Sequence, residues 1–200
     1  MSTAAWTVNE DGYLRAYQWA GALAGGSPMP TVTTALQLGP GEIAHADFAP
    51  VALAGYFGED TQYRSSFLLV GGPVGLAVTG AASLARNAAK KAEARRAAVP
   101  RWHALGMADV VVTSQRLAVS VGGQTESLWY AELGPAQLAA GTGGIAAVQV
   151  QPGGHPVLRI ESAWAPLLYV YVHHLVDGRP PAVPMPAGLL ERAKREGRLR

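Results

Sequence analysis

Apolar and polar residues alternate over short stretches in the second half of the chain, which is the pattern of half-buried β-strands. Glycine, proline and other turn residues separate these stretches, so each one reads as its own strand. The predicted strands cover residues 110–112, 117–121, 127–133, 145–151 and 157–162. The connections are too short for crossover helices, so we expect an antiparallel meander.

A further strand or hairpin is predicted between residues 31 and 57. The sequence alternates from Thr31, and a turn at 39–41 precedes β-like segments that continue to Phe57. Before it, residues 13–22 form one amphipathic segment, and the glycine- and proline-rich sequence GGSPMP, which interrupts regular structure, follows. We interpret residues 1–30 as an N-terminal extension.

Two segments have the apolar period or the composition of a helix rather than of a strand. Residues 164–176 carry apolar side chains three or four apart, which predicts a closing helix. Residues 76–98 are rich in strong helix formers, and Pro100 ends that pattern. The tail, residues 178–200, reads as a Pro-rich linker and then a basic terminal helix.

The stretch 109–123, DVVVTSQRLAVSVGG, predicts a hairpin whose tight turn contains Thr113 and Ser114. The hydroxyl of either residue can hydrogen-bond the backbone of the turn. Arg116 stands where this turn ends, where its stem can cover apolar neighbours and its guanidinium can pair with a carboxylate or a free carbonyl. The expected role of Arg116 is therefore structural.

This hairpin, VVTSQRL at 111–117, and the segment GPGE at 39–42 together resemble the bacterial pleckstrin-homology-like and GRAM-like domains, which commonly carry a "pGE" strand and an "lTxxRL" hairpin. Gly41, Glu42, Thr113 and Arg116 carry the resemblance, which covers roughly residues 36–177. It implies a mainly β fold with α (α+β): a bent antiparallel sheet or small barrel capped by a C-terminal helix. It also implies a binding or scaffolding module without catalytic residues or cofactors.

Within this organisation, residues 31–177 form the expected domain and residues 67–98 a long helical insertion. Residues 67–85 carry no charge, and a cluster of cations follows. We expect the apolar contacts to come from Phe67, Leu68, Leu69, Leu76 and Leu84. We expect the binding of a lipid or an acidic partner to come from Arg86, Lys90, Lys91, Arg95 and Arg96.

Three interpretations of the uncharged run remain open. Its nineteen residues are just long enough to span a bilayer as a helix. It can also make a peripheral or re-entrant membrane contact, or be buried within the chain or in an oligomer. A true span would place Glu42 and Arg116 on opposite sides of the membrane, so the two could not share a sheet.

Composition adds constraints but no chemistry. The formal net charge is +2 and 49% of the residues are hydrophobic, which fits a folded chain that is not strongly basic overall. Without cysteine there is neither a disulfide framework nor a thiolate metal site, which fits a reducing compartment. Acidic residues and Arg15 interrupt the N-terminal apolar runs, so we expect no signal peptide and a cytoplasmic protein, with a peripheral contact at the inner membrane face as the alternative.

No catalytic arrangement emerges from the sequence. The five histidines lack an HExxH spacing, the serines lack a GxSxG context, and the glycine-rich pieces precede no helix, so we expect no metal, no enzyme and no small-molecule substrate. The basic stretch has no interleaved aromatic residues for stacking on bases, so nucleic acid is not an expected partner. We expect a non-enzymatic adaptor that contacts a protein complex or an anionic membrane through the insertion. The alternative is a structural subunit of a homo-oligomer that uses the same insertion.

Overall fold

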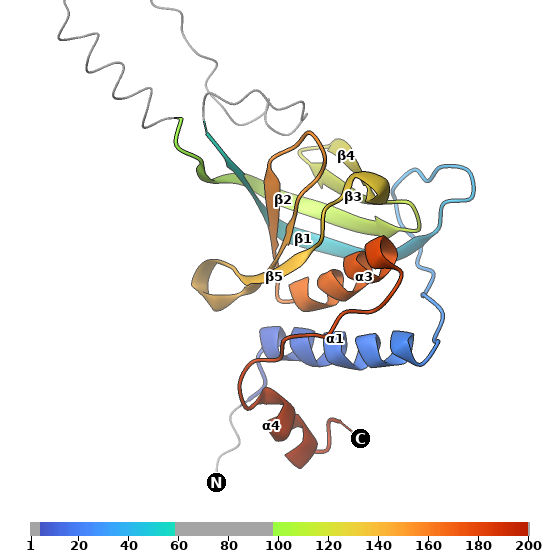
Figure 1. Cartoon of the computed structure of the whole chain (residues 1–200), viewed down its shortest axis with the longest axis vertical. Helices are drawn as coiled ribbons and strands as arrows, with labels where there is room; N and C mark the ends of the chain where they lie inside the picture. The colour runs from blue at the N-terminus through green and yellow to red at the C-terminus, as the bar shows by residue number, and fades with distance from the viewer. Residues whose placement is uncertain (1–4, 59–97, 200) are drawn as a thin grey trace, which may run out of the picture.

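The computed structural model describes residues 5–58 and 98–199, and in this part seven strands form one antiparallel sheet (Figure 1). The strands are β1 (Ala44–Phe57), β2 (Arg101–Thr113), β3 (Arg116–Val121), β4 (Gln124–Trp129), β5 (Gln137–Ala140), β6 (Ala146–Val150) and β7 (Val157–Glu161). The α-helices are α1 (Val8–Ala24), α3 (Ala165–Asp177) and α4 (Leu189–Arg195). Short 3-10 turns lie at Tyr130–Glu132 and Thr142–Gly144.

Strand β1 joins two antiparallel runs into a single sheet. The spatial order is β4-β3-β2-β1-β7-β6-β5, so β1 has β2 on one side and β7 on the other. β4 and β5 occupy the two edges and do not pair, so the sheet is open and not a closed barrel. The expected mixture of a mainly antiparallel sheet with helices is confirmed.

The main core lies between the sheet and the closing helix α3. Val110 and Val112 of β2 and Leu117 of β3 are fully buried, as period-two alternation requires for one face of a strand. They share one apolar cluster with Leu168 of α3. This cluster holds the sheet and its closing helix together, since burying each such side chain stabilises the fold by about 1.5–3 kcal/mol.

The opposite face of the first strands is also covered, by an extended segment without strand pairing. Val32, Leu36 and Leu38 pack there against a small cluster formed by Ala44, Val111 and Ala118. The alternation that predicts a strand from Thr31 therefore has a different cause. Apolar side chains of residues 32–38 face the sheet, while the regular strand begins at Ala44.

Most predicted elements exist, with shifted bounds. The strand predicted at 110–112 is the end of the thirteen-residue β2, and the one predicted at 127–133 divides into the end of β4 and a 3-10 turn. The sequence does not predict β5, because its four residues, QLAA, have little β propensity. The predicted closing helix is α3, and the predicted terminal helix is α4.

The N-terminal helix α1 packs on α3, so α3 lies between the sheet and α1 (Figure 1). Its start is fixed by a capping box, in which Thr7 and Glu10 bond each other's backbone N–H. Ala16, Ala20 and Leu23 are buried with Val170 of α3. Residues 8–24, predicted to belong to an extension, thus form a layer on the closing helix. The domain bounds themselves stay a prediction.

Gly12 lets α1 pack closely against the backbone that leads into α3. A Cβ at this position would lie 1.9 Å from the backbone oxygen of Ala163, whereas a Cβ at Gly21 of the same helix would meet nothing within 4 Å. We therefore expect Gly12→Ala to destabilise the protein by about 2 kcal/mol through overpacking. Gly21→Ala should stabilise it by about 0.5–1 kcal/mol. Urea unfolding of both variants checks this, and equal effects would show that α1 does not pack as described.

The predicted helical insertion, residues 67–98, falls almost entirely within residues 59–97, which lie outside the described residues. The predicted apolar run and basic helix lie there too. The two flanking ends are nevertheless fixed, because Phe57 of β1 pairs with Arg101 of β2. The chain therefore leaves and re-enters the sheet at one place, the end of the β1–β2 ribbon.

Candidate functional site

The segment GPGE builds a tight turn whose last residue points a carboxylate into the protein. Pro40 and Gly41 occupy its central positions, and Gly41 has φ of 70°, which the second central position of a type II turn requires. The N–H of Glu42 donates to the carbonyl of Gly39 at 3.1 Å. The N–H of Gly39 donates in return to Glu42 Oε2 at 2.7 Å. Turn and side chain thus fix each other.

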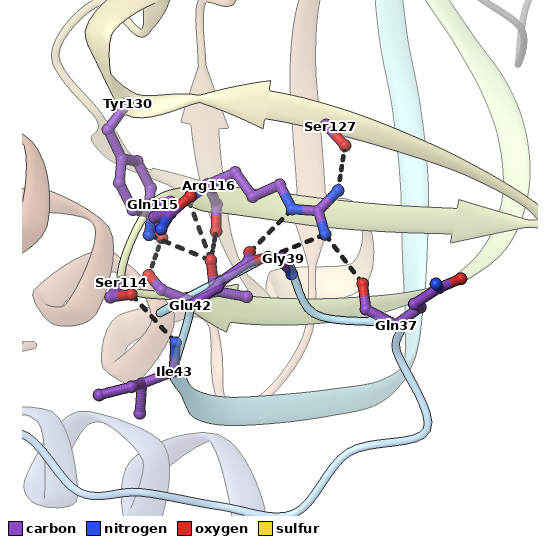
Figure 2. A network of polar contacts seen from close by, with 10 residues as sticks. Gln37, Gly39, Glu42, Ile43, Ser114, Gln115, Arg116, Ser127 and Tyr130 are labelled. Atoms are coloured by element: carbon purple, nitrogen blue, oxygen red, sulfur yellow. Dashed lines mark hydrogen bonds and ion pairs between the residues drawn. The ribbon is translucent and has the colours of Figure 1, made fainter.

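Arg116 reaches across from the start of β3 and pairs with that carboxylate (Figure 2). Its Nε donates to Glu42 Oε1 at 2.8 Å and its Nη2 to Oε2 at 3.1 Å, a two-bond pairing that matches the planar guanidinium. Nη2 also donates to the carbonyl of Gln37, at 3.1 Å, and Nη1 donates to the hydroxyl of Ser127. The side chain of Glu42 is only 1% exposed and that of Arg116 14%, so this is a buried ion pair.

Thr113 orders the hairpin turn from which Arg116 projects. Its hydroxyl accepts from the N–H groups of Gln115 and Arg116 and donates to the carbonyl of Arg116. The Tyr130 hydroxyl donates to the carbonyl of Thr113 at 2.9 Å. Burial raises the pKa of Tyr130, so this phenol stays protonated as a donor.

A second set of bonds joins the two turns directly. Ser114 N–H donates to the carbonyl of Ile43 at 2.8 Å, and the N–H of Ile43 donates to the Ser114 hydroxyl at 3.1 Å. We call the whole group the polar cluster (Figure 2); its members are Gln37, Gly39, Glu42, Ile43, Thr113, Ser114, Gln115, Arg116, Ser127 and Tyr130.

The electrostatics of the polar cluster favour the ionised carboxylate. Hydrogen bonds from Arg116 are the largest cause that lowers the pKa of Glu42, from 4.5 to about 2, and the bond from Gly39 adds to it. Burial opposes this shift but is outweighed. The charge on Glu42 is therefore bound tightly within the fold and is not poised to exchange a proton near neutral pH.

The structure brings together the four residues that carry the family resemblance, and it adds others. The predicted partners of Arg116, a carboxylate and a carbonyl, are Glu42 and Gln37, and the predicted turn hydroxyls are Thr113 and Ser114. Sequence reasoning gave no role to Ser127, which faces Arg116 only because β4 pairs with β3. All of the predicted lipid-contact and apolar-contact residues of the insertion lie outside the described residues.

A hollow of about 490 Å³ with a mixed polar and apolar lining opens beside the polar cluster, over the face of β1 to β4. Its lining includes Arg116, Asp47 and Asp109, with hydroxyl groups between them. Ser120 and Thr125 bond each other at 2.8 Å, and Thr34 donates to Asp47 at 3.4 Å. Much of its polar lining is thus bonded to neighbouring protein groups.

Neither a metal site nor a membrane-spanning helix is present in the described part of the chain. Across residues 5–58 and 98–199, no three His, Cys, Asp or Glu side chains are grouped as a metal site would require. None of the helices described there combines the length and apolar character needed to cross a bilayer. No protein-family model matches this sequence, and comparison with curated proteins and with solved structures found no significant match.

Proposed function

We propose that the chain is a non-enzymatic binding or adaptor module in which the sheet is the scaffold and residues 67–98 make the contact with a partner. The partner is a protein complex or the anionic inner face of a membrane. The pairing of Phe57 with Arg101 supports this proposal, because the two strands that flank the insertion in the sequence end side by side at one end of a folded sheet. That end lies away from α1 and α4 (Figure 1).

The contacts within the polar cluster favour a scaffold over an enzyme. Glu42 and Arg116 form a deeply buried charged pair, and both bond within the protein. A general acid or base needs a pKa near the working pH, whereas the pKa of Glu42 is about 2. The function of this pair is therefore to hold two turns together.

Strand pairing also constrains how the insertion could meet a membrane. A segment that crosses a bilayer once leaves its flanking residues on opposite sides. Strands β1 and β2 flank the insertion and pair with each other from Ala44 to Phe57. A single crossing is incompatible with this pairing, so the proposal takes a peripheral or re-entrant contact.

We also propose that the scaffold is a pleckstrin-homology-like or GRAM-like domain. Three observations support this: the two antiparallel runs that meet on β1, the closing helix α3, and the bond between the "pGE" turn and the "lTxxRL" hairpin. The bond between Glu42 and Arg116 also gives a physical reason why the two short motifs occur together.

The lipid contact is tested by changing Lys90, Lys91, Arg95 and Arg96 to Gln. Each cation near an anionic leaflet contributes about 1 kcal/mol, so this variant should lose nearly all co-sedimentation with phosphatidylcholine vesicles that contain phosphatidylglycerol. Wild-type binding should also fade with added salt. The matched control exchanges Lys and Arg at the same four positions and keeps the charge. Unchanged binding of the Gln variant would reject the lipid contact.

The homo-oligomer remains the alternative use of the insertion. This alternative requires that the wild-type protein does not bind anionic vesicles and that light scattering shows a single species larger than the monomer. Binding to anionic vesicles by a monomer would exclude it.

A further inference from the structure

The two ends of the described chain meet in a compact group of charges around Trp6. The guanidinium of Arg192 lies 4.3 Å from the centre of the Trp6 ring, and that of Arg198 lies 4.4 Å from it. The indole N–H of Trp6 donates to Glu196 Oε2 at 2.6 Å. An aromatic ring beside two cations is a favourable arrangement, because the negative face of the ring attracts the guanidinium groups.

Two acidic residues in the first turn of α1 hold the same arginines. Arg192 Nη1 lies 3.0 Å from Glu10 Oε1, and Arg198 Nη1 lies 2.7 Å from Asp11 Oδ1. Arg192 also bonds Glu196 within its own helix. We call these six residues the terminal clamp: Trp6, Glu10, Asp11, Arg192, Glu196 and Arg198.

Partly exposed charged contacts supplement a small apolar contact in holding α4. Of the seven residues of α4, only Leu189 and Ala193 are buried apolar residues. The ion pairs of the clamp are partly exposed, with Arg198 38% and Asp11 32% accessible, so each is weak and is screened by salt. A helix held in this way is among the elements most easily released from the fold.

The residues that α4 would present after release fit an anionic lipid surface. Leu189 and Ala193 form an apolar strip, and Leu190 and Leu199 are half-buried beside it. The cations of this segment are Arg192, Lys194, Arg195 and Arg198 and its acids are Glu191 and Glu196, so four positive and two negative charges leave residues 188–199 with a formal net charge of +2. Apolar side chains beside a basic face are the composition of a helix that lies in the membrane interface.

We propose that residues 188–199 are a membrane-binding helix stored on α1, and that an anionic lipid surface opens the terminal clamp by competing with Glu10 and Asp11 for the two arginines. The linker at 178–188 has eleven residues with four prolines, and at about 3.1 Å per residue it can extend roughly 30 Å. This reach matters because α4 and the end of the β1–β2 ribbon lie on opposite sides of the molecule (Figure 1).

The stored helix and the predicted insertion share a class of partner but use different residues, so lipid binding by one can be lost without loss of the other. Lipid binding that depends on Lys90, Lys91, Arg95 and Arg96 but not on Arg192 and Arg198 would leave the insertion contact standing and reject the stored helix. The reverse result would support the stored helix alone.

The test compares two double variants that open the clamp in opposite ways. Glu10→Gln with Asp11→Asn removes the α1 carboxylates that Arg192 and Arg198 bind, while the pair of Arg192 with Glu196 remains. The amide introduced at position 10 can still complete the capping box. We expect it to bind vesicles of phosphatidylcholine and phosphatidylglycerol several-fold more tightly than wild type. Arg192→Gln with Arg198→Gln opens the clamp but removes two cations, and we expect weaker binding, by about fivefold per arginine.

A control variant separates clamp opening from added charge. Asp109→Asn with Glu132→Gln raises the net charge as much as the first variant does, but both residues are exposed and lie outside the clamp and outside residues 188–199. It should change binding less than Glu10→Gln with Asp11→Asn does. Thermal unfolding of each variant verifies that the sheet is intact. If both clamp variants melt earlier yet bind vesicles as wild type does, the clamp is a purely structural contact and the inference is wrong.

Discussion

Replacing Glu42 by Gln should cost about 3–5 kcal/mol of unfolding free energy, the largest effect expected of any single substitution considered for this protein. The change removes the charge that Arg116 binds through two hydrogen bonds, and it leaves the guanidinium buried with only neutral partners. Breaking a buried ion pair by removing one member is strongly destabilising for this reason. Urea unfolding at neutral pH measures the difference.

The matched control for this variant is Glu191→Gln. Glu191 also pairs with a cation, Lys194, at 3.1 Å, but its side chain is 73% exposed. Surface pairs of this kind contribute about 0–1 kcal/mol, so the control should stay near wild type. Equal losses in the two variants would mean that burial does not strengthen the Glu42–Arg116 pair.

Acid should remove the same stabilisation in the wild-type protein. The pKa of Glu42 falls from 4.5 to about 2 on folding, chiefly because Arg116 bonds the ionised form. A carboxyl group with a lowered pKa in the folded state stabilises the fold fully above the unfolded pKa, and this contribution is lost as the pH falls toward the folded one. The loss should amount to about 3 kcal/mol between pH 4.5 and pH 2.

The measurement is the unfolding free energy of wild type and of Glu42→Gln at a series of pH values. The gap between them should be widest above pH 4.5 and should narrow steadily toward pH 2, because the amide of the variant cannot titrate. Other carboxylates contribute equally to both curves and cancel in the difference. A gap that stays constant down to pH 2 would contradict the role given to the ionised Glu42.

The strands and the kinds of partner that Arg116 binds could be predicted from the sequence because both depend on local patterns. Alternation identifies strands when one face is buried, and the turn chemistry around Thr113 is confined to four residues. The same reasoning could name a carboxylate or a carbonyl as the partner of Arg116 without knowing which one. Glu42 lies 74 residues away, and only the folded sheet selects it.

The features that the sequence did not predict have physical causes as well. Trp129 falls in a predicted strand, where a large aromatic side chain is expected in the core, yet it is 44% exposed. It ends the edge strand β4 and lies beside Arg116. The sequence predicts a basic terminal helix but not that Arg192 and Arg198 contact Trp6 at the other end of the chain. Contacts across more than 180 residues leave no periodic signal in the sequence.

Shared charge chemistry connects the polar cluster and the terminal clamp, but burial gives them different roles. The carboxylate of Glu42 is almost fully buried, so salt and competing anions cannot reach its bond with Arg116. The acids of the clamp are partly exposed, so competing anions can reach their arginines. The polar cluster therefore stabilises the scaffold, whereas the terminal clamp is suited to releasing α4.

A double-mutant cycle on Glu42 and Arg116 tests whether these two residues bind each other and so join the turn at residues 39–42 to the hairpin at residues 111–117 within one folded sheet. Unfolding free energies are measured for wild type, Glu42→Gln, Arg116→Met and the double variant. We expect a coupling energy of about 2 kcal/mol or more, with the double variant losing far less than the sum of the single variants. Strictly additive losses would show that the two side chains do not interact and that Glu42 does not hold Arg116 in the folded protein.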